Sequence, residues 1–200
     1  MNIEEFKKEV TDGKIKDKWY FYKRTEESKN ILVQDMESLS LFIKDKFNLD
    51  IYLIYGTLLG VIRENNFIEH DNDVDFAYMS KQSNLTDVLH EFQGICSILK
   101  NHELLSKICG SGHIHVYSPN KRNKFDLWTS FILEDKYYLA PLINGTLNPS
   151  MIIPLKESIF KTKSFLIPNQ PELVLDAVYN TWNTPILDNK GIKHTWKKII

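Results

Sequence analysis

The apolar positions of this chain follow two periods, one helical and one extended. Three stretches repeat apolar residues at three- and four-residue steps with charged or polar residues between them, which is the spacing of an amphipathic helix. These predicted helices span residues 25–47, 84–92 and 171–182. The last carries Pro171 in its first turn, where proline is tolerated because the missing N–H has no helical partner there.

Short apolar runs between these helices predict strands. Residues 51–55 form a continuous apolar run, which is typical of a buried strand. Four more predicted strands follow in quick succession, separated by short turn sequences, over residues 104–109, 113–118, 125–133 and 136–140. We expect these to form an antiparallel meander beside the first strands. The proline-rich segment 141–170 is expected to be irregular.

The domain organisation follows from length and composition. Two hundred residues, 42% of them hydrophobic, suit one domain with a sizeable core. Residues 1–24 are lysine-rich and contain the aromatic cluster Trp19-Tyr20-Phe21-Tyr22. We expect residues 1–24 to form an N-terminal arm whose cluster packs on a domain of residues 25–200. Stacking of the cluster on an aromatic ligand is the alternative.

Three aspartates at alternate positions, Asp71, Asp73 and Asp75, are the strongest chemical signal in the chain. In a strand, the period of two would place all three carboxylates on one face. Carboxylates this close repel one another unless a cation or a proton intervenes. The pattern therefore predicts a metal site, with a purely structural acidic face as the alternative.

The kind of metal follows from the ligand type. A D-x-D-x-D sequence also opens an EF-hand calcium loop, which needs glycine at its sixth position and a bidentate glutamate at its twelfth. Counted from Asp71, those positions hold Phe76 and Gln82, so the EF-hand is excluded. Oxygen-only ligation by aspartates favours Mg²⁺ or Mn²⁺.

A predicted phosphate-binding turn precedes the aspartates. Gly56 permits a tight turn, and Thr57 is a predicted N-cap of a short helix over residues 58–63. The free amides of such a helix start suit a phosphate group. Arg63 at the far end of this helix is predicted to clamp a diphosphate, because guanidinium binds phosphate in a bidentate way. A surface salt bridge is the alternative for Arg63.

Two later segments carry further polar side chains. Alternation places Lys124, Asp126 and Trp128 on one face of their strand. For Asp126, a salt bridge to Lys124 or Arg122 is the structural alternative to a functional role. His113 and His115 also share a strand face. No third nitrogen or thiolate ligand is obvious from the sequence around them, so structural or substrate contacts are expected rather than a transition metal.

Charge and cysteine content exclude several classes. The formal net charge of -1, from 25 basic and 26 acidic residues, argues against a nucleic-acid partner. Cys96 and Cys109 form no C-x-x-C motif, which excludes a disulfide framework or a four-cysteine zinc site. No signal peptide is evident, and the longest apolar run, residues 51–62, is too short for a transmembrane segment. We expect a cytoplasmic protein that can make peripheral contact with the inner face of a membrane.

The motifs around the aspartates resemble a known family. Gly56-Thr57-Leu58-Leu59-Gly60, Arg63, Phe67-Ile68 and Asp71-x-Asp73-Val74-Asp75 resemble the signature of the LicD family, which includes the fukutin-related phosphotransferases. Residues 152–155, Phe160 and residues 165–167 resemble its C-terminal segment, in which a short hairpin leads through a proline to a helix. Tyr179, Trp182 and Pro185 resemble the usual end of that segment. Glu69-His70 stands where the family commonly has Pro-Trp, and Asn72 replaces a frequent aspartate. The resemblance covers most of residues 31–185 and is highly specific only over 55–75.

This resemblance implies an α+β fold of the polymerase-beta-like nucleotidyltransferase type, with a mixed, mostly antiparallel sheet flanked by helices. It implies a catalytic Mg²⁺ or Mn²⁺ site held by Asp73, Asp75 and Asp126, with one aspartate, for example Asp126, as general base. The substrate-binding residues that it suggests are Gly56, Thr57, Arg63, Asp71 and Lys124.

The implied reaction moves a phosphorylated small alcohol, such as phosphocholine, glycerol phosphate or ribitol phosphate, from a CDP-activated donor. The implied acceptor is a cell-surface glycan or lipid-linked glycan, and CMP is released. Two alternatives stay open: a nucleotidyltransferase that attaches a nucleoside monophosphate and releases pyrophosphate, and a non-catalytic binding protein with the same fold.

Overall fold

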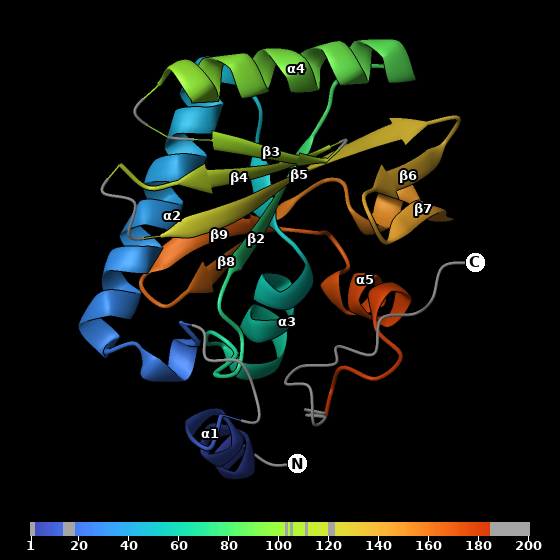
Figure 1. Cartoon of the computed structure of the whole chain (residues 1–200). Coiled ribbons are helices and arrows are strands. Elements are labelled where there is room, and N and C mark those ends of the chain that lie inside the picture. The colour runs from blue at the N-terminus through green and yellow to red at the C-terminus, as the bar shows by residue number, and fades with distance from the viewer. Residues whose placement is uncertain are drawn as a thin grey trace.

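A computed structural model describes residues 3–13, 19–102, 104, 106–110, 112–119 and 123–184, arranged as shown in Figure 1. A mixed, mostly antiparallel sheet runs through the centre and is flanked by helices, as the sequence predicts. Arg122, Pro185 and the basic tail after it lie outside the described residues.

The predicted helices are present, with shifted ends. The α-helices of the described residues are α1 (Ile3–Thr11), α2 (Glu26–Phe47), α3 (Tyr55–Glu64), α4 (Leu85–Asn101) and α5 (Pro171–Val178), and the 3-10 turns are η1 (Phe21–Lys23) and η2 (Pro149–Met151). Thr25 caps α2 by accepting from the Ser28 amide (3.1 Å), and Asn84 caps α4 by accepting from the Asp87 amide (3.0 Å). The predicted helix over 84–92 continues to residue 101.

The predicted strands are also present, but the segment 141–170 is more ordered than expected. The strands are β1 (Ile51–Leu53), β2 (Val74–Met79), β3 (Ser106–Gly110), β4 (His113–Tyr117), β5 (Lys124–Leu133), β6 (Lys136–Leu139), β7 (Ile143–Leu147), β8 (Lys156–Phe160) and β9 (Lys163–Ile167). The expectation of an irregular 141–170 was wrong for β7, whose polar positions leave no apolar run to mark it. The β8–β9 hairpin corresponds to the short hairpin that the family resemblance implies for this segment.

The sheet has the order β3-β4-β5-β2-β1-β9-β8, with β6 paired to β5 and β7 paired to β6. β3 to β6 form the expected antiparallel meander, and β7 extends it by one strand that was not predicted. The meander joins the first strands through β5, which pairs with β2 in parallel. This parallel pair matters for the site, because residues at the same register on β2 and β5 carry side chains on the same face.

One part of the core lies between the sheet and the helices α2 and α4, and another part includes buried apolar residues of α3 and α5. α2 packs on β1 and β9, and α4 packs on β3 and β5 (Figure 1). The rings of Phe76 on β2 and Phe125 on β5 lie 6.2 Å apart and are fully buried. Alternation then directs Asp75 and Asp126 to the opposite face.

Phe21 and Tyr22 of the aromatic cluster contact the loop before β2, whereas Trp19 is 75% exposed. The Phe21 amide donates to the carbonyl of Asp71 (2.7 Å), and the Tyr22 amide donates to the carbonyl of Glu69 (2.9 Å). The Phe21 ring lies 4.5 Å from the ring of Phe67. The arm is therefore bonded to the loop that carries the first aspartate.

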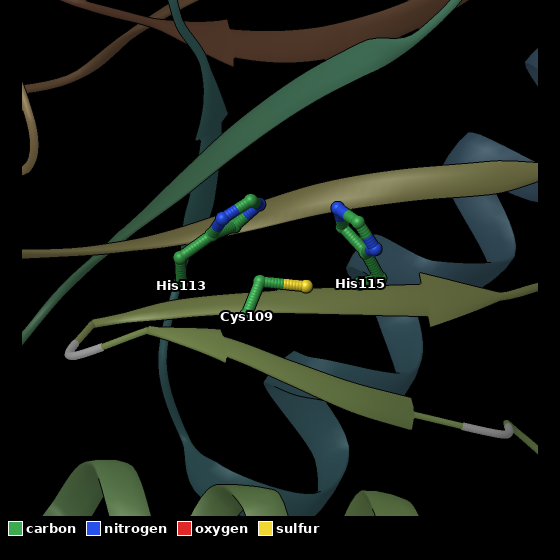
Figure 2. A group of neighbouring side chains, drawn as sticks. All are labelled: Cys109, His113 and His115. Atoms are coloured by element: carbon green, nitrogen blue, oxygen red, sulfur yellow. The ribbon is translucent and has the colours of Figure 1, made fainter.

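A bulge in β3 shapes one edge of the sheet. Ile108 pairs with Ile114, but Gly110 pairs with His113, so Cys109 is the extra residue of β3. Figure 2 shows the side chains of Cys109, His113 and His115 on the same side of the sheet.

Among the described residues, no helix combines the length and apolar character needed to cross a bilayer.

Candidate active site

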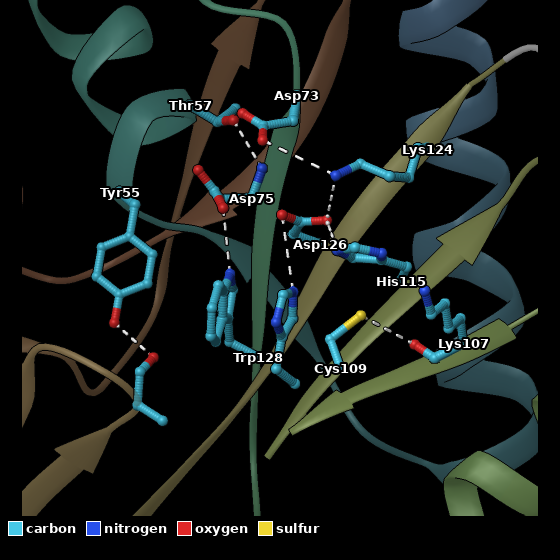
Figure 3. Close-up of polar contacts among 12 residues, drawn as sticks. Tyr55, Thr57, Asp73, Asp75, Lys107, Cys109, His115, Lys124, Asp126 and Trp128 are labelled. Carbon is cyan, nitrogen blue, oxygen red and sulfur yellow. Dashed lines mark hydrogen bonds and ion pairs between the residues drawn. The ribbon is translucent and has the colours of Figure 1, made fainter. Parts of the chain in front are cut away.

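The three carboxylates expected to bind metal come together on β2, β5 and the loop before β2 (Figure 3). Asp75 lies directly opposite Asp126 in the parallel pair. The ammonium group of Lys124 lies 3.0 Å from Asp126 Oδ1 and 3.9 Å from Asp73 Oδ2. Because one ammonium group reaches both carboxylates, Asp73 and Asp126 border the same small space.

The alternating aspartates do not form the predicted ladder within one strand. β2 begins at Val74, so Asp71 and Asp73 belong to the preceding loop. Their carboxylates still converge, because Asp71 shares a hydrogen bond with Asp73 and lies close enough to Asp75 to feel its charge. The loop, rather than strand alternation, gathers the first two carboxylates.

Helix α3 begins beside these aspartates, and earlier than predicted. It starts at Tyr55 after the cap residue Ile54, so the predicted N-cap role of Thr57 is wrong. Tyr55 has φ +48, a left-handed conformation that no local sequence signal announces. Thr57 Oγ1 instead accepts from the amide of Asp75 (2.9 Å), which joins α3 to β2.

Gly56 is required by the closeness of the carboxylates. A Cβ at this position would lie 2.6 Å from Asp71 Oδ2 and 3.6 Å from Asp75 Oδ2. The backbone of Gly56 also hydrogen bonds to the Asp75 carboxylate. The start of α3 thus faces carboxylates, which its partial positive charge stabilises. The roles of Gly56 and Thr57 toward a phosphate stay predictions.

Asp71 and Asp75 are costly to ionise in this arrangement. Burial, followed by repulsion from Asp73 and Asp75, raises the pKa of Asp71 well above its usual value. Burial, followed by repulsion from Asp73 and Asp126, does the same to the pKa of Asp75. A bound cation would remove this repulsion, so the cluster has the electrostatic character of a cation site.

The pKa of Asp126 is shifted in the opposite direction, because an ammonium group and two imidazoles surround its carboxylate. His115 Nε2 lies 3.3 Å from its Oδ1, and His113 Nε2 lies 3.6 Å from its Oδ2. Burial would raise the pKa of Asp126, but His113, Lys124 and His115 together lower it below the usual value. The ion pair that formed the structural alternative for Asp126 is present, and it coexists with the register pairing to Asp75.

The indole of Trp128 is a site residue that sequence reasoning missed. Its Nε1–H donates to Asp75 Oδ1 (3.1 Å), and its ring stacks on His113 with centroids 3.7 Å apart. Alternation placed Trp128 on the face of Asp126. It gave no sign that the indole would reach a carboxylate on the neighbouring strand.

Arg63 is engaged by residues of the chain itself. Its guanidinium pairs with Glu64 and donates to the carbonyl of Trp182 (3.0 Å). The side chain is only 11% exposed. These contacts match the salt-bridge alternative, and the diphosphate clamp stays a prediction.

A cavity of about 750 Å³ adjoins the carboxylates. Lys124 and Asn72, neighbours of Asp126 and Asp73, line it on one side. The other lining residues come from the arm, α2 and the segment before β5: Trp19, Arg24, Thr25, Glu27, Ser28, Ile31 and Asn123. Its size suits a small organic ligand, and Trp19, which is 75% exposed, offers a free aromatic face.

Comparison with known proteins gives the family. The family described as LicD/FKTN/FKRP, nucleotidyltransferase domain, matches residues 48–170, which is more than half of the chain. The chain belongs to the LicD family. The matched region contains α3, the aspartate loop and β5, so it includes every metal-binding and substrate-binding residue that the resemblance implies. Tyr179, Trp182 and Pro185 lie beyond it.

One relative extends the similarity beyond this region. The uncharacterized protein RP689 of Rickettsia prowazekii (strain Madrid E) is 26% identical over 180 residues, which cover 84% of this chain. The same residues cover 65% of that protein, so this chain spans less than two thirds of its relative's length. The name of this relative states no activity.

The site residues fit a divalent metal ion. Asp73, Asp75 and Asp126 offer only carboxylate oxygens, the donor set preferred by Mg²⁺ and Mn²⁺.

Proposed function

We propose that this LicD protein is a metal-dependent transferase with a polymerase-beta-like nucleotidyltransferase fold. It moves a phosphorylated small alcohol, of the phosphocholine, glycerol phosphate or ribitol phosphate type, from a CDP-activated donor to a glycan or lipid-linked glycan. The catalytic domain comprises residues 25–200, and residues 1–24 form an arm on it. The observation that supports this proposal is the meeting of Asp75 and Asp126 across a parallel strand pair, with Asp73 beside them.

The proposed metal ligands are Asp73, Asp75 and Asp126. Mg²⁺ or Mn²⁺ held there would neutralise charge on the donor phosphates and on the departing nucleotide. Lys124 pairs with both Asp73 and Asp126, so its ammonium group is placed to contact a phosphate oxygen as a point charge. The lowered pKa of Asp126 favours it as a ligand over its alternative role as general base.

The cavity beside Lys124 is the proposed donor site. Its free aromatic face, Trp19, suits stacking with the cytosine ring. Arg24 and Asn123 also line the cavity, where Arg24 Nη1 donates to Asn123 Oδ1 (2.7 Å). In the reaction, the acceptor hydroxyl oxygen forms a bond to the phosphorus distal to cytidine. The bond from that phosphorus to CMP breaks, and a carboxylate of the site accepts the hydroxyl proton.

The test is product analysis with a panel of donors. CDP-choline, CDP-glycerol and CDP-ribitol are incubated with the protein, Mg²⁺ and glycan acceptors, and released CMP and pyrophosphate are quantified. Metal-dependent CMP release that Asp73→Asn abolishes is the expected result. Pyrophosphate release from CTP would favour nucleotidyl transfer instead. Calorimetry that detects no binding of Mg²⁺ or of any CDP-alcohol would favour a non-catalytic protein.

A further inference from the structure

A second group of metal-ligating side chains lies next to the carboxylates. Cys109 on β3 and His113 and His115 on β4 each place one ligand atom within 4.8 Å of the other two. Figure 2 shows the thiol and both imidazoles gathered on one side of the sheet. They are close in space because β3 and β4 are antiparallel, and the bulge inserts Cys109 between the residues that pair with Ile114 and His113.

One ring nitrogen of this group, the buried His113 Nε2, has no hydrogen-bond partner among the described residues. Its nearest carboxylate oxygen, Asp126 Oδ2, is 3.6 Å away, which is beyond hydrogen-bond distance. A buried polar atom without a partner is unfavourable, so a ligand at this position would stabilise the site.

We propose that Cys109, His113 and His115 form a binding site for a transition metal of the Zn²⁺ class. One thiolate and two imidazoles are the ligand types of zinc sites, and three protein ligands leave a fourth position for water or substrate. Cys109 is exposed, which gives an ion access from solvent. The sulfur and nitrogen ligands distinguish this site from the oxygen-only carboxylates, which select hard cations.

Asp126 connects the two sites. It lies 3.3 Å from His115 and 3.0 Å from Lys124, at the boundary between the imidazoles and the carboxylates. Metal-bound histidines commonly have a carboxylate partner that fixes the ring. In this role Asp126 is a positioning residue for the thiolate–imidazole site. The proposal of that metal site does not depend on the transferase proposal.

The test uses Co²⁺ as a spectroscopic probe on the full chain after metal removal. Co²⁺ bound by Cys109 is expected to give a thiolate-to-cobalt charge-transfer band at one equivalent, and Zn²⁺ should abolish that band by displacement. A large excess of Mg²⁺ should leave it unchanged. Cys109→Ser should remove the band, and His115→Ala should weaken Co²⁺ binding by more than about 100-fold. Asp126→Asn should weaken it by about 10- to 100-fold, as expected for a positioning residue.

Matched variants make the result decisive. Cys96→Ser alters the other cysteine, on α4, and Asp73→Asn alters the carboxylate site; both should retain the band. Zn²⁺ should also slow alkylation of Cys109, measured by mass spectrometry of the modified peptide. A wild-type protein without the band, or a band that survives Cys109→Ser, would overturn the proposal.

Discussion

Asp75 and Asp126 lie directly opposite one another on parallel strands, yet their surroundings shift their pKa values in opposite directions. Asp75 is buried among carboxylates, with the Trp128 indole as a neutral donor. Asp126 has an ammonium group and two imidazoles around it. The pair therefore combines one carboxylate that needs a cation with one that the protein already keeps ionised.

Removing a carboxylate should abolish turnover without unfolding the protein. Asp73→Asn and Asp75→Asn are each expected to lower metal-dependent CMP release by at least about 100-fold, because a ligand of the proposed metal ion is lost. In chelator, their melting temperatures should equal or exceed that of the wild type, since repulsion among the carboxylates is relieved. Asp45→Asn on the exposed face of α2 is the control and should change neither value. Full activity of Asp73→Asn would contradict the assigned site.

The metal-free protein should lose stability as pH rises. The raised folded-state pKa values of Asp71 and Asp75 mean that folding favours their protonated forms. Their contribution is therefore present below the unfolded pKa of about 3.9 and is lost as pH climbs through the folded values. Melting temperatures in chelator, compared between wild type and Asp75→Asn from acid to neutral pH, measure this loss. The melting temperature of the wild type should fall more steeply with pH than that of Asp75→Asn, and saturating Mg²⁺ should make the wild-type fall less steep. Parallel curves for the two proteins would contradict this prediction.

Gly56→Ala should disturb the carboxylates directly. The new methyl group would meet Asp71 Oδ2 at 2.6 Å, so we expect a cost of about 1–3 kcal/mol in the free energy of unfolding and weaker Mg²⁺ binding. Gly94→Ala is the matched control, because nothing lies within 4 Å of a Cβ there on α4. That change should stabilise by about 0.5–1 kcal/mol. Urea unfolding curves of both variants give the comparison, and equal effects would show that the close approach is tolerated.

Trp128→Phe isolates the indole hydrogen bond while keeping a ring against His113. Loss of a donor to a buried carboxylate should cost about 1–3 kcal/mol of stability and weaken metal binding. Trp182→Phe removes a similar bond, from Nε1 to Asp176 Oδ1 (2.7 Å), at an exposed place. Its effect should be smaller because water replaces the lost partner. If chemical denaturation shows no difference between the two variants, the indole does not support Asp75.

Strong periodicity made most of the fold predictable. The apolar stripe and the capping residues located α2 and the start of α4, and turn sequences separated the meander strands. The Gly56-Thr57 turn and the alternate aspartates identified the family. These features are local, so each could be judged from a few neighbouring residues.

The remaining features depend on contacts between distant segments. The left-handed Tyr55 lies where α3 turns toward the aspartates, and its hydroxyl donates to the carbonyl of Ala140 (2.7 Å), far along the chain. The parallel pairing of β2 with β5 is likewise set by packing, and it decides which carboxylate faces Asp75. The approach of Cys109 to His113 depends on a bulge that no residue type announces.

The hydrogen bond from Phe21 to Asp71 has a consequence for how the site is maintained. Phe21 lies well upstream of residue 48, where the family similarity begins, yet its amide and ring cover the aspartate loop at Asp71 and Phe67. A fragment restricted to the shared region would uncover that backbone and that ring. A segment without any family motif is thus one of the determinants of the loop's shape, and the N-terminal arm and the aspartate loop should open together when the protein fluctuates.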